Sequence, residues 1–284
     1  MAENGSPARR LWQVYEPLHA VAYFAPETAE AMRGAGLKGF WMGYFGSRLA
    51  PMGAVDAAAA GAVCFPFAPR RVQRALPDAW RLAPPETVLN AYLGAVERVL
   101  ERALPPGAQV ARLAGLLERA VEGCSFEGRP LAAAWAAVER PASAVLRLWL
   151  AATILREHRG DGHTMALAHA GLTGLEASVT HVATGAVPRE PLQSARGWTE
   201  EEWEEAERGL AARGLLDAEG RPTAAGEAVR RTVEEDTDRL AAGPVTALGE
   251  AGLEEAVALA TPLARHLLDT GAVPAANPIG LPRP

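Results

Sequence analysis

GLAARGLLDAEGRPTAAGEAV, residues 209–229, carries more information about the fold than any other part of the chain. Its alanine-rich start continues a helix that an Arg-Gly pair ends, and Leu215-Leu216 then form a short apolar strand. Asp217-Ala-Glu-Gly220 has the composition of a turn, and Pro222-Thr-Ala-Ala-Gly opens a long helix to about Leu240. This order of helix, strand, turn, strand and helix predicts the wing of a winged-helix domain.

The residues on both sides extend this domain. Thr199-Glu-Glu-Glu202 has the spacing of a capping box, in which a threonine and a glutamate three residues later satisfy the first N–H groups of a helix. Earlier in the chain, Thr173-Gly-Leu-Glu176 has the same spacing and predicts another helix start. We therefore predict a winged-helix segment over 197–243. A proline- and glycine-bearing linker over 183–197 precedes it, and an apolar C-terminal helix over 248–272 follows it.

The composition predicts a mainly α-helical, cytoplasmic protein. The chain has 284 residues, is 49% hydrophobic and contains much alanine but few β-branched residues, which favours helices over strands. Two cysteines cannot build a disulfide framework or a cysteine-based zinc site. No apolar stretch reaches the ~20 residues of a membrane span, and the polar start MAENGSPARR lacks a signal-peptide core.

Residues 11–182 are expected to form a multi-helical domain with a candidate ligand pocket. Prolines cut its first hundred residues into short helices, whereas 86–104 has one clean amphipathic face. The same spacing of seven residues separates Trp41 from Arg48 and Trp149 from Arg156. A glycine lies a few residues after each arginine, at Gly53 and Gly160. An internal duplication and chance in an alanine-rich chain both explain this repeated spacing.

The string REHRGDGH, residues 156–163, is the strongest candidate for chemistry. We expect Gly160 and Gly162 to break the helix here, with Asp161 as the N-cap of the next one. Two imidazoles and two carboxylates would then surround one corner, as acid–base catalysis requires. The predicted catalytic residues are His158, His163, Asp161 and Glu157.

Two other interpretations of this string remain open. The acids could cap helices and pair with the neighbouring arginines, so that the corner has only a structural role. Alternatively, His158, His163 and His169 could hold a metal, although their spacings of five and six fit no standard zinc pattern. We therefore predict no metal and no cofactor.

The aromatic run FWMGYFGSR, residues 40–48, is the second candidate. Polar tips alternate there with apolar rings, and a helix from this run could form a cavity wall opposite 156–163, although plain core packing is the alternative. The predicted ligand-binding residues are Tyr44, Arg48, Trp41, Phe45, Trp149 and Arg156.

The charge of the winged-helix segment argues against DNA binding. Residues 197–243 contain 13 acids and 6 arginines, a net charge of −7, and the helix before the wing carries six glutamates. In this type of domain that helix usually enters the major groove, where phosphate neutralisation supplies most of the affinity. No tight binding to duplex DNA is expected.

Longer strings in the chain resemble a known family. YFGSRLAPMG (44–53), FPFAPRRVQRALPDAW (65–80), LREHRGDGHTMALAHAGLTGLEA (155–177) and RGWTEEEWEEAERGLAARGLL (196–216) are similar to actinobacterial helix-turn-helix proteins of unknown function. The stretch 209–229 resembles the wing of regulators of the multiple-antibiotic-resistance type. The resemblance implies a helical N-terminal part and a regulator-like winged helix, and it assigns no catalytic residues.

Two hypotheses for the function follow. The first is a small-molecule-binding protein derived from a winged-helix regulator, which acts as a cofactor-independent acid–base enzyme of secondary metabolism, such as a cyclase, isomerase or hydrolase. The second is a ligand-responsive transcription regulator or drug-binding sensor. The expected partners are a small organic molecule and a second copy of the chain, without a membrane. An apolar stripe suggests the dimer face: Ala260, Leu263, Leu267 and Leu268.

Overall fold

The computed structural model describes residues 5–105, 107–274, 281 and 283–284, and this part of the chain is mainly helical, as predicted. The helices are, in chain order, α1 (Pro7–Phe24), α2 (Pro26–Gly34), α3 (Gly39–Leu49), the 3₁₀ turn η1 (Ala50–Met52), α4 (Ala57–Val63), α5 (Pro69–Gln73), α6 (Asp78–Leu82), α7 (Pro85–Ala103), α8 (Ala108–Val121), α9 (Pro130–Ala136), α10 (Ala144–His169), α11 (Gly174–Ala183), α12 (Arg189–Arg196), α13 (Glu200–Ala212), α14 (Ala224–Leu240) and α15 (Ala242–Asp269). No helix in the described ranges combines the length and the apolar character that a membrane crossing needs.

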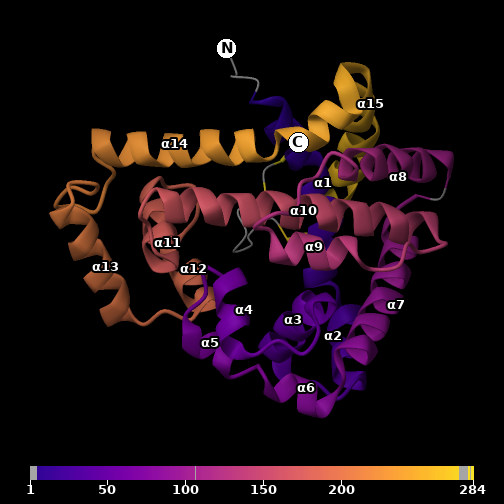
Figure 1. The fold of residues 1–284 in the computed structure, drawn as a ribbon, viewed down its shortest axis with the longest axis horizontal. Coiled ribbons are helices and arrows are strands. Elements are labelled where there is room, and N and C mark those ends of the chain that lie inside the picture. Colours follow the sequence, from indigo (N-terminus) through magenta and orange to yellow (C-terminus); the bar gives the residue numbers. More distant parts are fainter. Residues whose placement is uncertain (1–4, 106, 275–280, 282) are drawn as a thin grey trace.

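Helix α10 runs through the middle of the molecule (Figure 1). It packs against α1, α7, α8, α9 and α14, and its first half is buried on all sides, with Trp149 fully covered. A helix that is apolar all round belongs in a core, because no face of it gains from contact with water. Around α10 lies the first hydrophobic core, which takes in most of α1 to α9 and the C-terminal helix.

Helix α15 closes this first core rather than presenting an interface. It packs on α1 and α8, and the proposed dimer stripe is covered there: Ala260, Leu263 and Leu267 are buried and Leu268 is partly buried. The residues expected to form a dimer face therefore serve the core of the single chain. A homodimer stays a prediction, and it would need another surface.

The predicted break at Gly160–Gly162 is wrong, because α10 continues to His169 without interruption. Each glycine costs a helix only about 1 kcal/mol relative to alanine, which tertiary packing can offset. Asp161 does not cap its own helix. Its carboxylate accepts the N–H groups of Leu131 and Ala132, at 3.1 and 3.0 Å, and so holds the start of α9 against α10.

The second hydrophobic core includes the segment 197–243, and we call α11 to α14 the winged-helix part after the prediction made for that segment. The end of α10 packs there with α11, α13 and α14, around the fully buried Trp203 and Leu210. The capping boxes predicted at Thr173 and Thr199 are both present. Figure 1 shows α13 at the outer edge of the molecule, with α14 leading back over α10.

Two predictions in this part need correction. The linker predicted over 183–197 contains the helix α12. The two wing strands are reduced, within the described residues, to a single antiparallel bridge between Leu216 and Pro222. The bridge does not extend into a ladder, because the N–H group of Leu215 donates to the carbonyl of Leu210 and that of Arg221 donates to the side chain of Asp217.

Candidate functional site

A cavity of about 320 Å³ lies between the two hydrophobic cores, and we call it the junction cavity. Seven helices supply its walls: α1, α3, α4 and α10 from the first core, and α11, α12 and α14 from the winged-helix part. The residues that line it are Trp12, Glu16, Tyr44, Arg48, Val63, Phe65, Pro66, Phe67, Arg156, Arg159, Gly160, Asp161, His163, Thr164, Leu167, Ala177, Ser178, His181, Leu192, Arg196, Arg230, Glu234 and Thr237.

A buried ion-pair network forms the floor of the junction cavity. The carboxylate of Glu157 accepts two hydrogen bonds from Arg48, both 2.9 Å long, and one of 2.8 Å from Arg156. Burial alone would raise the pKa of Glu157, but the two guanidinium groups outweigh it and hold the pKa at about 2. The network continues from Arg156 to Glu16 at 3.5 Å and from Arg48 to the hydroxyl of Tyr44 at 3.2 Å.

Arg196 is a cation without a carboxylate partner among the described residues. Its guanidinium lies over the ring of Phe67, 4.4 Å from the centroid, and its buried Nε has no hydrogen-bond partner. Burial lowers the pKa of Arg196, and the nearby charges of Arg48 and Arg156 lower it further. A guanidinium held in this way is ready to accept an anion.

Arg159 adds a second open donor. Its Nη2 binds Asp238 at 2.6 Å and its guanidinium lies over Trp12, whereas its buried Nη1 has no partner within the described chain. The junction cavity therefore combines a paired floor with guanidinium groups whose hydrogen-bonding capacity is not fully used.

His163 offers an unprotonated nitrogen to the same cavity. Its Nδ1 lies 2.8 Å from the hydroxyl oxygen of Thr237, and that hydroxyl donates its own proton to the carbonyl of Val233 at 2.6 Å. The Thr237 oxygen must then accept from Nδ1–H, which leaves Nε2 with a free lone pair. Burial lowers the pKa of His163 to about 4, so the ring is neutral at pH 7. His181 lines the cavity as well, and burial lowers its pKa too.

The structure brings together half of the residues proposed from the sequence. Those that line the junction cavity are Tyr44, Arg48, Arg156, Asp161 and His163. Glu157 lies beneath them, 1% exposed, and its contacts are the arginines rather than the open space. Their roles in binding or catalysis stay predictions.

The other four proposed residues lie elsewhere. His158 is 1% exposed, does not line the cavity, and has no hydrogen-bond partner on either ring nitrogen. Its pKa is lowered to about 4 by burial and by Arg129. The rings of Trp41, Phe45 and Trp149 belong to the aromatic part of the first core, and the apolar walls come from Trp12, Phe65 and Phe67 instead.

Several lining residues were missed because they come from distant segments. Arg196 lies at the end of α12, inside the predicted linker, and Glu16 and Arg230 lie on helices that carry no motif. The signals in the sequence were weak: an isolated histidine at 181 and an arginine before Gly-Trp at 196. Within the described ranges, no three side chains of His, Cys, Asp or Glu are placed to share a metal ion.

The surface of the winged-helix part is acidic where DNA would lie. In α13, Glu200, Glu201, Glu204 and Glu205 are all exposed. At the wing, Arg221 is held at 2.9 Å by both Asp217 and Glu219, so its charge is already neutralised. In the described residues of α13 and the wing, Arg208, Arg213 and Arg221 all pair with acids, so these segments offer no free cation to a phosphate group.

Comparison with known proteins gives a family but no individual relative. No curated protein and no solved structure matches the chain significantly. The model of one family, described as a helix-turn-helix family, matches residues 8–274. Since the match includes both hydrophobic cores and the junction cavity between them, the chain belongs to this helix-turn-helix family.

Proposed function

We propose that the protein is a ligand sensor that binds a small organic anion in the junction cavity. The observation that carries this proposal is the unpaired guanidinium of Arg196. Around it, Arg48 and Arg156 are balanced by Glu157 and Glu16, so the group as a whole has one positive charge in excess. A buried guanidinium nitrogen without a partner is costly, and a bound carboxylate, phosphate or sulfate would remove that cost.

The position of the cavity supports a sensor. Arg196 lies on α12 and Thr237 on α14, both in the winged-helix part, whereas Tyr44 lies on α3 in the first core. A ligand that contacts both parts favours the arrangement in which its contacts are best, and so shifts the population of conformations. The similarity of the wing to regulators of the multiple-antibiotic-resistance type supports the same proposal.

Native mass spectrometry of freshly purified protein would first show whether a ligand is already bound. The decisive test measures hexanoate binding by calorimetry in the wild type, in Arg196→Gln and in Arg74→Gln. Arg74 is exposed and lies outside the cavity, so its variant has the same charge change. We expect Arg196→Gln to weaken binding by about tenfold or more, because a hydrogen bond to a charged group contributes about 1.5–3 kcal/mol. Equal affinities in both variants would contradict the proposal.

An acid–base enzyme is the second candidate, and His163 is the observation that favours it. A neutral imidazole whose Nδ1–H is fixed by Thr237 has Nε2 free to take a proton from a bound molecule. His163→Asn keeps a side-chain N–H for Thr237 but removes the Nε2 base. For an enzyme, this variant should bind the ligand identified by mass spectrometry but not convert it. If the wild type leaves that ligand unchanged, the sensor is favoured.

A further inference from the structure

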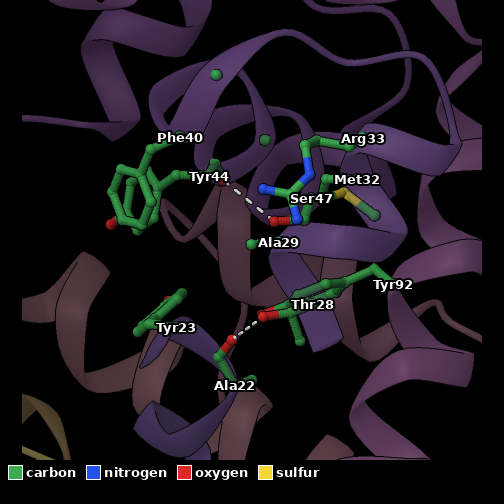
Figure 2. A pocket seen from close by; sticks show the side chains of 12 residues that line it. Ala22, Tyr23, Thr28, Ala29, Met32, Arg33, Phe40, Tyr44, Ser47 and Tyr92 are labelled. Atoms are coloured by element: carbon green, nitrogen blue, oxygen red, sulfur yellow. Dashed lines mark hydrogen bonds between the residues drawn. The ribbon is translucent and has the colours of Figure 1, made fainter. Parts of the chain in front are cut away.

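A second pocket of about 210 Å³ lies beside the junction cavity, and we call it the tyrosine pocket. It is formed between α1, α2, α3 and α7, and Tyr23, Tyr44, Tyr92, Met32, Thr28 and Ser47 are among its walls. Figure 2 shows the rings of Tyr23 and Phe40 on one side of the opening and Met32 and Ser47 on the other, with Ala29 between them.

The polar atoms of the tyrosine pocket are mostly used inside the protein. Thr28 donates to the carbonyl of Ala22 at 2.7 Å, and Ser47 donates to the carbonyl of Tyr44 at 3.3 Å. The hydroxyl of Tyr23 lies 2.9 Å from Nε2 of His19. Apart from the exposed Arg33 and the hydroxyl groups of Tyr44 and Tyr92, the remaining side chains offer mainly rings and aliphatic groups. Such a pocket suits an apolar group rather than a charged one.

Tyr44 belongs to both spaces. On helix α3, Phe40, Tyr44 and Ser47 follow at intervals of four and three residues and line the tyrosine pocket. Tyr44 and Arg48, again four residues apart, line the junction cavity. Residues at this spacing are neighbours on one face of a helix, and Ser47 and Arg48 lie on opposite sides of Tyr44 there. Helix α3 therefore separates the two spaces, and the ring of Tyr44 lies at the boundary between them.

The size of the tyrosine pocket argues that it holds part of a ligand. Sites for small organic molecules have volumes of about 300–1,000 Å³, and the tyrosine pocket alone is below this range. Together with the junction cavity, it reaches the middle of the range. In the part of the chain that the structure describes, the hydroxyl of Tyr44 accepts a hydrogen bond from Arg48 but donates to no acceptor. Its proton is therefore free for a ligand atom that lies at the boundary between the two spaces.

We propose that the two spaces bind the two ends of one amphipathic organic acid. Its carboxylate lies at Arg196 in the junction cavity, and its apolar tail passes Tyr44 into the tyrosine pocket. This inference rests on the proposed function, because the anion site in the junction cavity sets the position of the charged end.

The test uses straight-chain acids of increasing length, namely acetate, hexanoate and decanoate, and measures their affinity by calorimetry. Ala29 is half-buried and lines the tyrosine pocket, so Ala29→Phe fills that pocket. Glu30→Phe adds the same ring on the exposed side of α2, outside both spaces, and is the matched control. Melting temperatures establish that both variants are folded.

In the wild type and in Glu30→Phe, we expect affinity to rise by about fourfold for each methylene buried, up to the capacity of the pocket. In Ala29→Phe, this rise should stop at about the length of hexanoate. Arg196→Gln should weaken binding of every acid by a similar factor.

The outcomes separate the two proposals. If affinity does not depend on chain length in the wild type, or if Ala29→Phe keeps the full dependence, the tail does not enter the tyrosine pocket and the inference is wrong. If Arg196→Gln binds all acids as the wild type does, the proposed function fails instead. Should Ala29→Phe not fold, contacts in wild-type NMR spectra between the terminal methyl of decanoate and the ring protons of Tyr92 decide the question, and their absence overturns the inference.

Discussion

The imidazole of His158 illustrates at the residue scale how a polar side chain can be buried without a role in the cavity. It is 1% exposed, and neither of its nitrogens forms a hydrogen bond of ordinary geometry; the backbone of Ser125 only partly offsets the lowering of its pKa by burial. A buried polar group without a partner costs about 1–3 kcal/mol. We expect His158→Leu to raise the free energy of unfolding at pH 7 by about 1 kcal/mol, measured with urea. His158→Ala leaves a void and should lower it, and a loss in both variants would show that the imidazole is bonded in solution.

The same histidine predicts how stability depends on pH. Burial lowers the pKa of His158 to about 4, below the ordinary value of 6.5 in the unfolded chain. The unfolded chain therefore binds more protons between these values, so stability present above pH 6.5 is lost as the pH falls toward 4. His19, with a pKa of about 3, and His163 act in the same direction. Burial raises the pKa of Asp161 to about 6, so this carboxyl group has the opposite effect on stability below that pH.

Urea unfolding at several pH values checks this dependence. Removal of one such histidine changes the slope of the free energy of unfolding against pH by about 1.4 kcal/mol per pH unit. Between pH 6 and 5, we therefore expect His158→Leu to lose stability less steeply than the wild type by about that amount. Parallel curves would contradict the lowered pKa of His158.

For Glu157 we expect a loss of stability, in contrast to His158→Leu, because its carboxylate binds both Arg48 and Arg156. Glu157→Gln keeps the shape of the side chain but leaves Arg48 and Arg156 without their shared carboxylate. Breaking a buried ion pair costs about 3–5 kcal/mol, and we expect a loss of that size in urea unfolding at pH 7. Glu254→Gln, which removes an exposed pair with Arg10, should cost far less, because solvent screens an exposed ion pair. Similar losses in both variants would mean that the buried network is dispensable.

At the scale of secondary structure, the sequence predicted those features that depend on interactions between neighbouring residues. The capping boxes at Thr173 and Thr199 and the long helix after the wing are all present. The break at Gly160 was wrong because its cost is small compared with the contacts that α10 makes along its length. In a continuous helix, residues 156, 160 and 163 lie on one face and line the junction cavity, whereas 158 lies on another. The junction cavity therefore takes in part of the proposed site, whose role stays a prediction, and the predicted corner does not exist.

The two glycines of α10 make this point testable. A Cβ at Gly160 would have ordinary contacts with Glu157 and Arg156, at 3.7 and 3.9 Å, so Gly160→Ala should stabilise the protein by about 0.5–1 kcal/mol. A Cβ at Gly162 would lie 2.7 Å from Nη1 of Arg129, which is bound to the carbonyl of His158, while Nη2 binds that of Leu240. Gly162→Ala should therefore destabilise the protein by about 1–2 kcal/mol, since it displaces these hydrogen bonds. Thermal unfolding of both variants measures the difference, and equal gains would mean that Arg129 moves aside freely.

At the scale of the whole molecule, the junction cavity exists only because two hydrophobic cores meet. Its residues come from seven helices between α1 and α14, and no spacing in the sequence relates Trp12 or Arg196 to His163. Periodicity and capping describe neighbours along the chain, whereas these contacts depend on how helices pack. The sequence could therefore predict the helices and one wall of the cavity, but not the unpaired arginine opposite.

The distribution of charge over the whole molecule gives the last prediction, which concerns DNA. Residues 197–243 have a net charge of −7, from 13 acids and 6 arginines, and the exposed face of α13 is acidic. Non-specific binding to duplex DNA has a Kd of about 10⁻⁴–10⁻⁶ M even for proteins with free cations, because it depends on neutralised phosphates. We expect fluorescence anisotropy at about 150 mM salt to give no submicromolar affinity.

A charge-reversal variant shows whether charge is the reason. Glu204 and Glu205 are exposed, lie outside the capping box at Thr199 and pair with Arg208 on the same helix, so replacing both by lysine should leave the fold intact. If α13 has the geometry of a reading helix, this variant should bind duplex DNA more tightly, and its log K should fall by about 0.9 per contacted phosphate with log salt. Submicromolar binding by the wild type would contradict the prediction and place DNA on a different face. A variant that gains no affinity would mean that shape, as well as charge, keeps α13 out of the groove.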